Sequence, residues 1–249
     1  MNWRVLLEPV GRAGADNMAL DCALLDEAQR TGTAWLRLYR WDPPCLSLGR
    51  NESARARYDR SAIERLGLDV VRRPTGGRAV WHEHEVTYAV AAPVDRFGSL
   101  RNAYRLIHER LAAALRSLGA DAHLAPDRPA PRPPIHPGAC FAAAAGGEVL
   151  VDGRKLVGSA QLRQGTVLLQ HGSILLEGSQ ETVRAVSRQP SANGHATTLR
   201  RVLGHPVTFD EVVAAITSTW GGPWTPSASV RPRPPLSPHF SDPDWTWRR

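Results

Sequence analysis

Residues 152–176, DGRKLVGSAQLRQGTVLLQHGSILL, carry the clearest strand and turn signals in the chain. Asp152-Gly153 suits a type I′ turn between alternating strands, so the sequence predicts a hairpin with strands at 148–151 and 155–163. The segment ends in two further predicted strands, at 166–169 and 173–176. This part of the chain is therefore expected to be rich in hairpins.

Helix and strand patterns alternate along the rest of the chain. Residues 16–30 place apolar side chains on one face of a helix, with Asp16 or Asn17 as the N-cap. Further helices are predicted at 57–66, 99–118 and 208–220, and strands at 35–39, 45–48, 69–72, 79–80 and 86–92. The sequence therefore predicts a mixed α/β (α+β) protein.

Two proline-rich stretches interrupt these patterns. Residues 126–137 hold six prolines, which exclude regular structure and favour an extended connection. Strand-like sequence resumes after them, so we expect a loop inside one domain that spans residues 1–249. The tail from residue 223 is again rich in proline.

Charge and cysteine content limit the class of protein. The 31 basic and 24 acidic residues give a net charge of +7, but the arginines are scattered. An acidic protein partner explains this charge as well as a nucleic acid does, and we expect no nucleic-acid partner. The N-terminus has no apolar signal segment, and no apolar run reaches the ~20 residues of a spanning helix. We therefore expect a cytoplasmic protein, with no membrane contact and with free thiols.

The Gly-Gly pair at 76–77 lies in RRPTGGRAVWH, residues 72–82. Such a pair most often forms only a tight turn. It also allows the backbone to approach a ligand closely, with Arg72, Arg73 and Arg78 near enough to meet a carboxylate or phosphate. Both interpretations stay open from the residues alone.

Lys155 follows the predicted hairpin turn, where a lysine is usually a solvated charge. If the strand carries it inward, its ammonium group could polarise an acyl carbonyl or hold a phosphate. The small residues Gly158, Ser159 and Ala160 would leave space there for a substrate.

Cys140 lies between the proline-rich loop and Phe141, unlike Cys22 on a helix face or Cys45 inside a strand. A lone cysteine is usually a small buried hydrophobe, which is our interpretation of Cys22 and Cys45. A thiolate at Cys140 could take an acyl group from a thioester and pass it to an amine. His171 could assist as a base, or it could be a satisfied structural group.

The run His82-Glu83-His84-Glu85 has the residue types of a metal site. In a strand, His82 and His84 would share one face without an obvious third ligand, whereas metal sites need three or four converging ligands. We therefore predict no metal site.

Taken together, these segments resemble the biotin/lipoate protein ligase superfamily along nearly the whole chain. DNMALDCALL at 16–25 is similar to the family's opening helix, and WDPPCLSLGRNES at 41–53 to a strand that ends in Gly-Arg. RRPTGGRAVWHEHEVTYAV at 72–90 is similar to its Arg-Arg-x-x-Gly-Gly loop, and residues 152–176 to its Lys-x-x-Gly-Ser-Ala element followed by His-Gly-Ser. Cys140-Phe141 resembles the Cys-Phe of the cysteine-dependent octanoyltransferase branch, which is itself similar to lipoate-protein ligase A.

The resemblance implies a mixed, largely antiparallel sheet flanked by helices, with an apolar acyl tunnel beside the Gly-Gly pair. It implies Cys140 as the nucleophile and Lys155 at the acyl carbonyl. The tail 239–249 is expected to fold back onto the domain. The residues implied around the acyl group are Arg73, Thr75, Gly76, Gly77, Arg78, His82, Gly158, Ser159, Ala160, His171 and Gly172.

The activity implied is octanoyl transfer from acyl carrier protein, through a cysteine thioester, to a lysine of a lipoyl domain such as glycine cleavage H protein. This reaction needs no cofactor. One alternative is an ATP-dependent lipoate-protein ligase that forms lipoyl-AMP and uses ATP and Mg. A second alternative is a non-catalytic protein that binds a lipoyl or biotinyl group. Cys22, where the family more usually has an acidic residue, and the long proline-rich loop depart from the family pattern.

Overall fold

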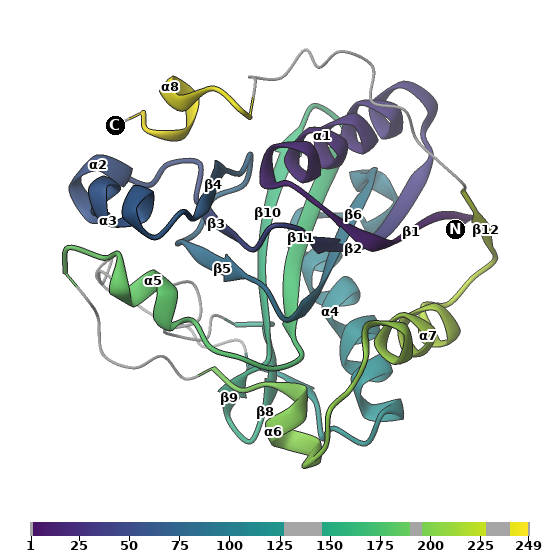
Figure 1. The fold of residues 1–249 in the computed structure, drawn as a ribbon. Coiled ribbons are helices and arrows are strands. Elements are labelled where there is room, and N and C mark those ends of the chain that lie inside the picture. The colour runs from purple at the N-terminus through teal and green to yellow at the C-terminus, as the bar shows by residue number, and fades with distance from the viewer. Residues whose placement is uncertain (1, 127–145, 190–195, 228–239, 249) are drawn as a thin grey trace.

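The computed structural model describes residues 2–126, 146–189, 196–227 and 240–248, and a six-stranded mixed sheet forms its centre (Figure 1). The strand order is β10-β11-β6-β2-β1-β12. Neighbours are antiparallel from β10 to β2, whereas β1 pairs parallel with both β2 and β12. The strands are β10 (Val157–Gln164), β11 (Val167–Leu175), β6 (Glu85–Pro93), β2 (Ala34–Trp41), β1 (Trp3–Arg12) and β12 (Trp224–Pro226).

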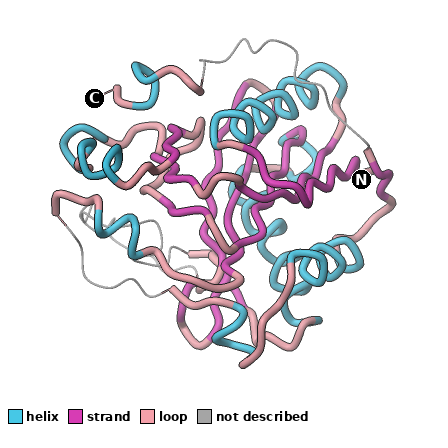
Figure 2. The backbone as a smooth tube through the Cα atoms, viewed as in Figure 1, coloured by secondary structure: helices cyan, strands magenta, loops and turns pink. Residues whose placement is uncertain are grey.

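Helices cover both faces of this sheet, as Figure 2 shows by the cyan tubes around the magenta strands. Helix α1 (Gly14–Thr31) packs through Leu24 and Leu25 against β6 and β11 on one face. Helices α4 (Leu100–Ser117) and α7 (Phe209–Thr219) pack on the opposite face, where most of the apolar core lies. Alternation along β2 separates the two sides, because Leu36 and Leu38 face α4 while Arg37 faces α1.

Two small sheets flank the large one. The first has the order β4-β3-β5, with β4 (Asp69–Arg72), β3 (Cys45–Leu48) and β5 (Val80–His82). The second has the order β7-β8-β9, with β7 (His123–Leu124), β8 (Val149–Val151) and β9 (Arg154–Lys155). The remaining elements are α2 (Ala54–Arg57), α3 (Arg60–Arg65), the 3₁₀ helix η1 (Val94–Phe97), α5 (Glu181–Ala185), α6 (Leu199–Leu203) and α8 (Pro243–Thr246).

The predicted mixed sheet with flanking helices is confirmed, and so is the turn at Asp152-Gly153. Both turn residues have positive φ, 50° and 70°, as a type I′ turn requires, and Val151 pairs with Arg154. The hairpin differs from the prediction after Lys155, because Leu156 separates β9 from β10 and the two strands belong to different sheets.

Three other expectations need correction, and one strand was missed. The predicted break at 170–172 is wrong, because β11 runs without interruption through His171 and Gly172. The helix predicted at 57–66 is split, since Tyr58 is extended and Asp59 caps a new helix. Helix α1 begins before the proposed caps Asp16 and Asn17, with Ala13 at the N-cap position. Strand β1 was not predicted at all.

The C-terminal tail folds back onto the small β3 sheet, as expected for 239–249. Arg72 is fully buried and donates hydrogen bonds to the carbonyl oxygens of Trp245, Thr246 and Arg248. The same guanidinium donates to the carbonyl oxygens of Gly49, Arg50 and Glu52. Arg72 is therefore committed to holding backbone together, which is not the anion-binding role considered from the sequence.

Replacing Arg72 by Met should lower the free energy of unfolding by about 3 kcal/mol or more, because several buried carbonyl groups lose their donor. Urea unfolding followed by tryptophan fluorescence measures this change, with Trp245 and Trp247 reporting on the tail. The matched control is Arg201→Met, which removes an exposed arginine. Equal stability of the two variants would contradict a structural role for Arg72.

Candidate active site

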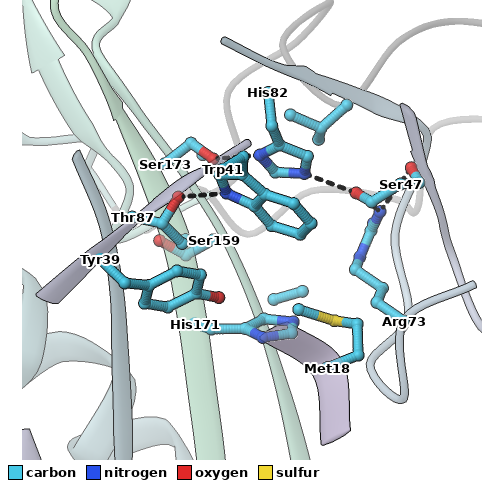
Figure 3. A pocket seen from close by; sticks show the side chains of 14 residues that line it. Met18, Tyr39, Trp41, Ser47, Arg73, His82, Thr87, Ser159, His171 and Ser173 are labelled. Atoms are coloured by element: carbon cyan, nitrogen blue, oxygen red, sulfur yellow. Dashed lines mark hydrogen bonds between the residues drawn. The ribbon is translucent and has the colours of Figure 1, made fainter. Parts of the chain in front are cut away.

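A cavity opens between the β10–β11 edge of the large sheet and the small β3 sheet (Figure 3). Its empty volume is about 350 Å³, including the space at its mouth. Aromatic and sulfur-containing side chains lie beside hydroxyl groups and two histidines. The lining residues are Met18, Tyr39, Trp41, Ser47, Arg73, Val80, His82, Thr87, Gly158, Ser159, Ala160, His171, Gly172 and Ser173.

His171 lies in β11 with both ring nitrogens occupied. Nδ1 is 2.8 Å from Asp21 Oδ2, and Nε2 is 2.6 Å from Thr75 Oγ1. Asp21 is itself paired with Arg37, at 2.7 Å, and neither side chain is exposed. Burial lowers the pKa of His171, and the hydrogen bond to Asp21 only partly opposes this effect. His171 is therefore a neutral histidine that is hydrogen-bonded to Asp21 of α1.

His82, at the end of β5, has a similar arrangement on the opposite wall. Its Nε2 is 2.7 Å from Ser47 Oγ, and its Nδ1 is 2.7 Å from Glu85 Oε1. The Trp41 ring stacks on the imidazole, with 4.0 Å between ring centroids and 14° between planes. This stacking explains how a polar ring is kept in one orientation beside an apolar cavity.

Arg73 organises the loop from Arg73 to Arg78, hereafter the Gly-Gly loop. Its guanidinium donates to the carbonyl oxygens of Gly76, Arg78 and Ser47, at 2.7–3.2 Å. The loop also lies so close to Gly49 that a Cβ there would be 2.0 Å from the Gly77 oxygen. Arg73 thus closes the turn internally while part of its side chain lines the cavity.

Lys155 is carried inward by β9, not left in solvent. Its side chain is 2% exposed, and Nζ is 2.7 Å from Glu148 Oε1. Lys155 does not belong to the described residues that line the cavity. Cys140 lies outside the described residues, so its place relative to Lys155 is a prediction only.

Ser159 lines the cavity, but its hydroxyl group forms hydrogen bonds with residues on the opposite face of the sheet. Ser159 Oγ is 2.7 Å from the Tyr88 hydroxyl and 2.8 Å from His108 Nε2, and His108 Nδ1 is 2.7 Å from the Gly147 oxygen. Burial lowers the pKa of His108 to about 4, although its bond to Gly147 opposes this change. His108 is therefore neutral and ties α4 to the chain just before β8.

The structure brings together seven of the predicted substrate-binding residues at the cavity: Arg73, His82, Gly158, Ser159, Ala160, His171 and Gly172. Thr75 contacts the cavity wall through His171, whereas Gly76, Gly77 and Arg78 complete the loop behind Arg73. Sequence reasoning missed Asp21 and Glu85, which hold the two histidines. It also missed the lining residues Met18, Tyr39, Trp41, Ser47, Val80, Thr87 and Ser173.

The His82–Glu85 run differs from the strand considered in the sequence. Residues 83 and 84 form the bend between β5 and β6, so the side chains of Glu83 and His84 are about half exposed while His82 turns inward. Across the described parts of the chain, no three His, Cys, Asp or Glu side chains converge as a metal site would need. Those parts also contain no helix long and apolar enough to cross a membrane.

Comparison with known proteins identifies the class of protein that has this fold and cavity. The chain belongs to the family of lipoyl protein ligase A/B catalytic domains, whose sequence model matches residues 13–221. Among its relatives, Octanoyltransferase LipM of Kyrpidia tusciae is 44% identical over 231 residues, which is 86% of this chain and 84% of that protein.

Solved structures show the same fold. Protein Ta0514 of T. acidophilum, solved with bound lipoic acid, superposes with a TM-score of 0.77 and 20% identity, over 99% of this chain and 100% of that one. A bi-partite lipoate protein ligase of Thermoplasma acidophilum, described with its E2 lipoyl domain, gives a TM-score of 0.73 and 20% identity, over 99% and 96% of the two chains.

The buried His108 should make stability depend on pH. The unfolded chain binds a proton near pH 6.5 that the folded protein excludes until about pH 4, so the free energy of unfolding falls as the pH drops through this interval. His171 acts in the same direction. A His108→Gln variant should be less stable at neutral pH and lose ~2 kcal/mol less between about pH 7 and pH 4.5.

Urea titrations between about pH 7 and pH 4.5 test this expectation. The control variant is His123→Gln, which replaces an exposed histidine. If the curves for wild type and His108→Gln run parallel, then folding does not lower the pKa of His108 and the assignment is wrong.

Proposed function

We propose that this protein is an octanoyltransferase that moves an octanoyl group onto a lysine of a lipoyl domain. The observation that carries the proposal is its 44% identity, over most of both chains, to a relative named as an octanoyltransferase. The cavity supports it, since Met18, Tyr39 and Trp41 offer apolar surface to a medium-length acyl chain. Burial lowers the pKa of His171 beside them, which favours its neutral form and suits an uncharged ligand.

The proposed donor is octanoyl-acyl carrier protein, and Cys140 is the proposed nucleophile. Its thiolate attacks the thioester carbonyl, the carrier leaves as a thiol, and an octanoyl-enzyme forms. The amine of the acceptor lysine then attacks this second thioester, forms an amide and releases Cys140. Because a thioester is already activated, neither ATP nor a metal ion takes part.

Lys155 is proposed to stabilise the negative oxygen that develops in both steps. Its pairing with Glu148, and the 2% exposure of its side chain, are the features that support an ordered ammonium group in a dehydrated setting. The proposed acceptor is a lipoyl domain such as that of glycine cleavage H protein. A reducing cytoplasm suits this chemistry, because Cys140 must stay a thiol.

The covalent step is tested by intact-protein mass spectrometry after mixing the enzyme with octanoyl-acyl carrier protein in the absence of ATP. We expect a mass gain of one octanoyl group that hydroxylamine removes. Cys140→Ala should abolish the gain, whereas Cys22→Ala, which alters a buried cysteine of α1, should retain it. If the Cys140→Ala variant forms the same hydroxylamine-labile octanoyl adduct as the wild type, then Cys140 is not the nucleophile.

Lys155→Met should slow formation of this adduct by about 10²-fold or more, because the oxyanion loses its positive partner. Rapid-quench mass spectrometry gives the rate, and circular dichroism checks the fold, since Glu148 loses its ion pair in the same variant. Arg154→Met is the matched control, because Arg154 neighbours Lys155 on β9 but is exposed. A wild-type rate for Lys155→Met would remove Lys155 from the mechanism.

A further inference from the structure

The hydrogen atoms around Asp21 can be assigned from donor chemistry alone. Arg37 can only donate, and its Nη1 lies 2.7 Å from Asp21 Oδ1. The other carboxylate oxygen, Oδ2, is 2.8 Å from His171 Nδ1 and 3.1 Å from the Tyr39 hydroxyl. Burial alone would raise the pKa of Asp21, but Arg37 and His171 outweigh it and lower the pKa, so the group is an ionised acceptor.

The state of His171 follows from this acceptor. A neutral imidazole carries one N–H, and that N–H must be on Nδ1, where the Asp21 carboxylate accepts it. Nε2 is then an acceptor, so the Thr75 hydroxyl, 2.6 Å away, must be the donor. The direction of every hydrogen bond from Arg37 to Thr75 is therefore determined by the fixed charge at Arg37.

Thr75 directly precedes the Gly-Gly pair, and the protein holds it at two points. Its side chain is bound by His171, and its carbonyl oxygen accepts the Arg50 N–H at 2.8 Å. Thr75 is fully buried, whereas Gly77 is exposed. The bond to His171 thus joins the Gly-Gly loop, which belongs to the small β3 sheet, to β11 of the large sheet.

We propose that Asp21 is a positioning residue, which holds His171 as the Nδ1–H tautomer so that Nε2 binds Thr75 and fixes the Gly-Gly loop against the cavity. The consequence for catalysis rests on the proposed octanoyl transfer, whereas the tautomer does not. The same arrangement recurs on the opposite wall. Arg73 donates to Ser47 Oγ at 3.1 Å, Ser47 Oγ lies 2.7 Å from His82 Nε2, and His82 Nδ1 lies 2.7 Å from Glu85 Oε1.

Asp21→Asn gives a sharp test because it keeps the shape while it removes the negative charge and replaces one acceptor by a donor. The asparagine oxygen must stay at Arg37, which can only donate, so the amide nitrogen takes the place of Oδ2 and faces His171. A donor at this place forces Nδ1 to accept. His171 should therefore switch to the Nε2–H tautomer and reverse its bond to Thr75.

Nitrogen-15 NMR of histidine side chains reads the tautomer directly. We expect protonated Nδ1 in the wild type and in Asp16→Asn, a control that changes an exposed acid of the same helix, and protonated Nε2 in Asp21→Asn. Retention of the Nδ1–H tautomer in Asp21→Asn would overturn the proposal. These spectra need no substrate, so they remain decisive even if the protein does not transfer octanoyl groups.

Thr75→Val provides a second test, which is valid even if the Asp21→Asn variant does not fold. It removes the hydroxyl donor but leaves Asp21 in place, so His171 should keep its Nδ1–H tautomer. The kcat/KM for formation of the octanoyl-enzyme should nevertheless fall about tenfold or more, because the loop loses its bond to β11. Unchanged kcat/KM in Thr75→Val would show that the bond does not position the loop, which contradicts the proposal.

Discussion

The ion pair between Arg37 and Asp21 is the interaction on which the geometry of the site depends. Arg37 lies in the middle of β2 with no exposure to solvent, and a charge there is tolerated only because acceptors surround it. Glu8 in β1 accepts from Nε at 2.6 Å, and Asp21 and Asn17 in α1 accept from the other nitrogens. The same charge thus fixes α1 on the sheet and orients Asp21 toward His171.

Three buried cationic residues, of which Arg73 lines the cavity, make contacts within the protein. Arg72 binds carbonyl groups of the tail, Arg73 closes the Gly-Gly loop, and Lys155 pairs with Glu148. Two histidines complete the walls, each held between an acidic residue and a hydroxyl group. Such a wall suits a ligand whose bound part is uncharged, which agrees with an acyl chain presented as a thioester.

Much of the fold could be predicted because local signals were strong. The Asp152-Gly153 turn, for example, marks the hairpin of β8 and β9. The predicted strands ended at 169 and resumed at 173, whereas β11 continues through Gly172. Its actual role is spatial: a Cβ there would lie 2.4 Å from the Gly158 oxygen of the paired strand.

The sequence predicted the motifs of the site, but not the acidic residues that hold its histidines. Gly158 to Ala160, His171 and the Gly-Gly pair stand together in recognisable segments. Asp21 and Glu85, in contrast, are ordinary acidic residues in a helix and a strand until the fold places them against histidines, in the case of Asp21 one 150 residues away. Pairings at this separation arise from tertiary packing, which no local pattern encodes.

The central claim is that a lipoyl domain receives its octanoyl group from an activated carrier. The most direct measurement is the mass of a purified lipoyl domain after incubation with the enzyme, comparing octanoyl-acyl carrier protein without ATP against free lipoate with ATP and Mg²⁺. The account predicts octanoylation of one lysine in the first mixture and none in the second. Modification only in the mixture with ATP would contradict it and identify the protein as a lipoate ligase.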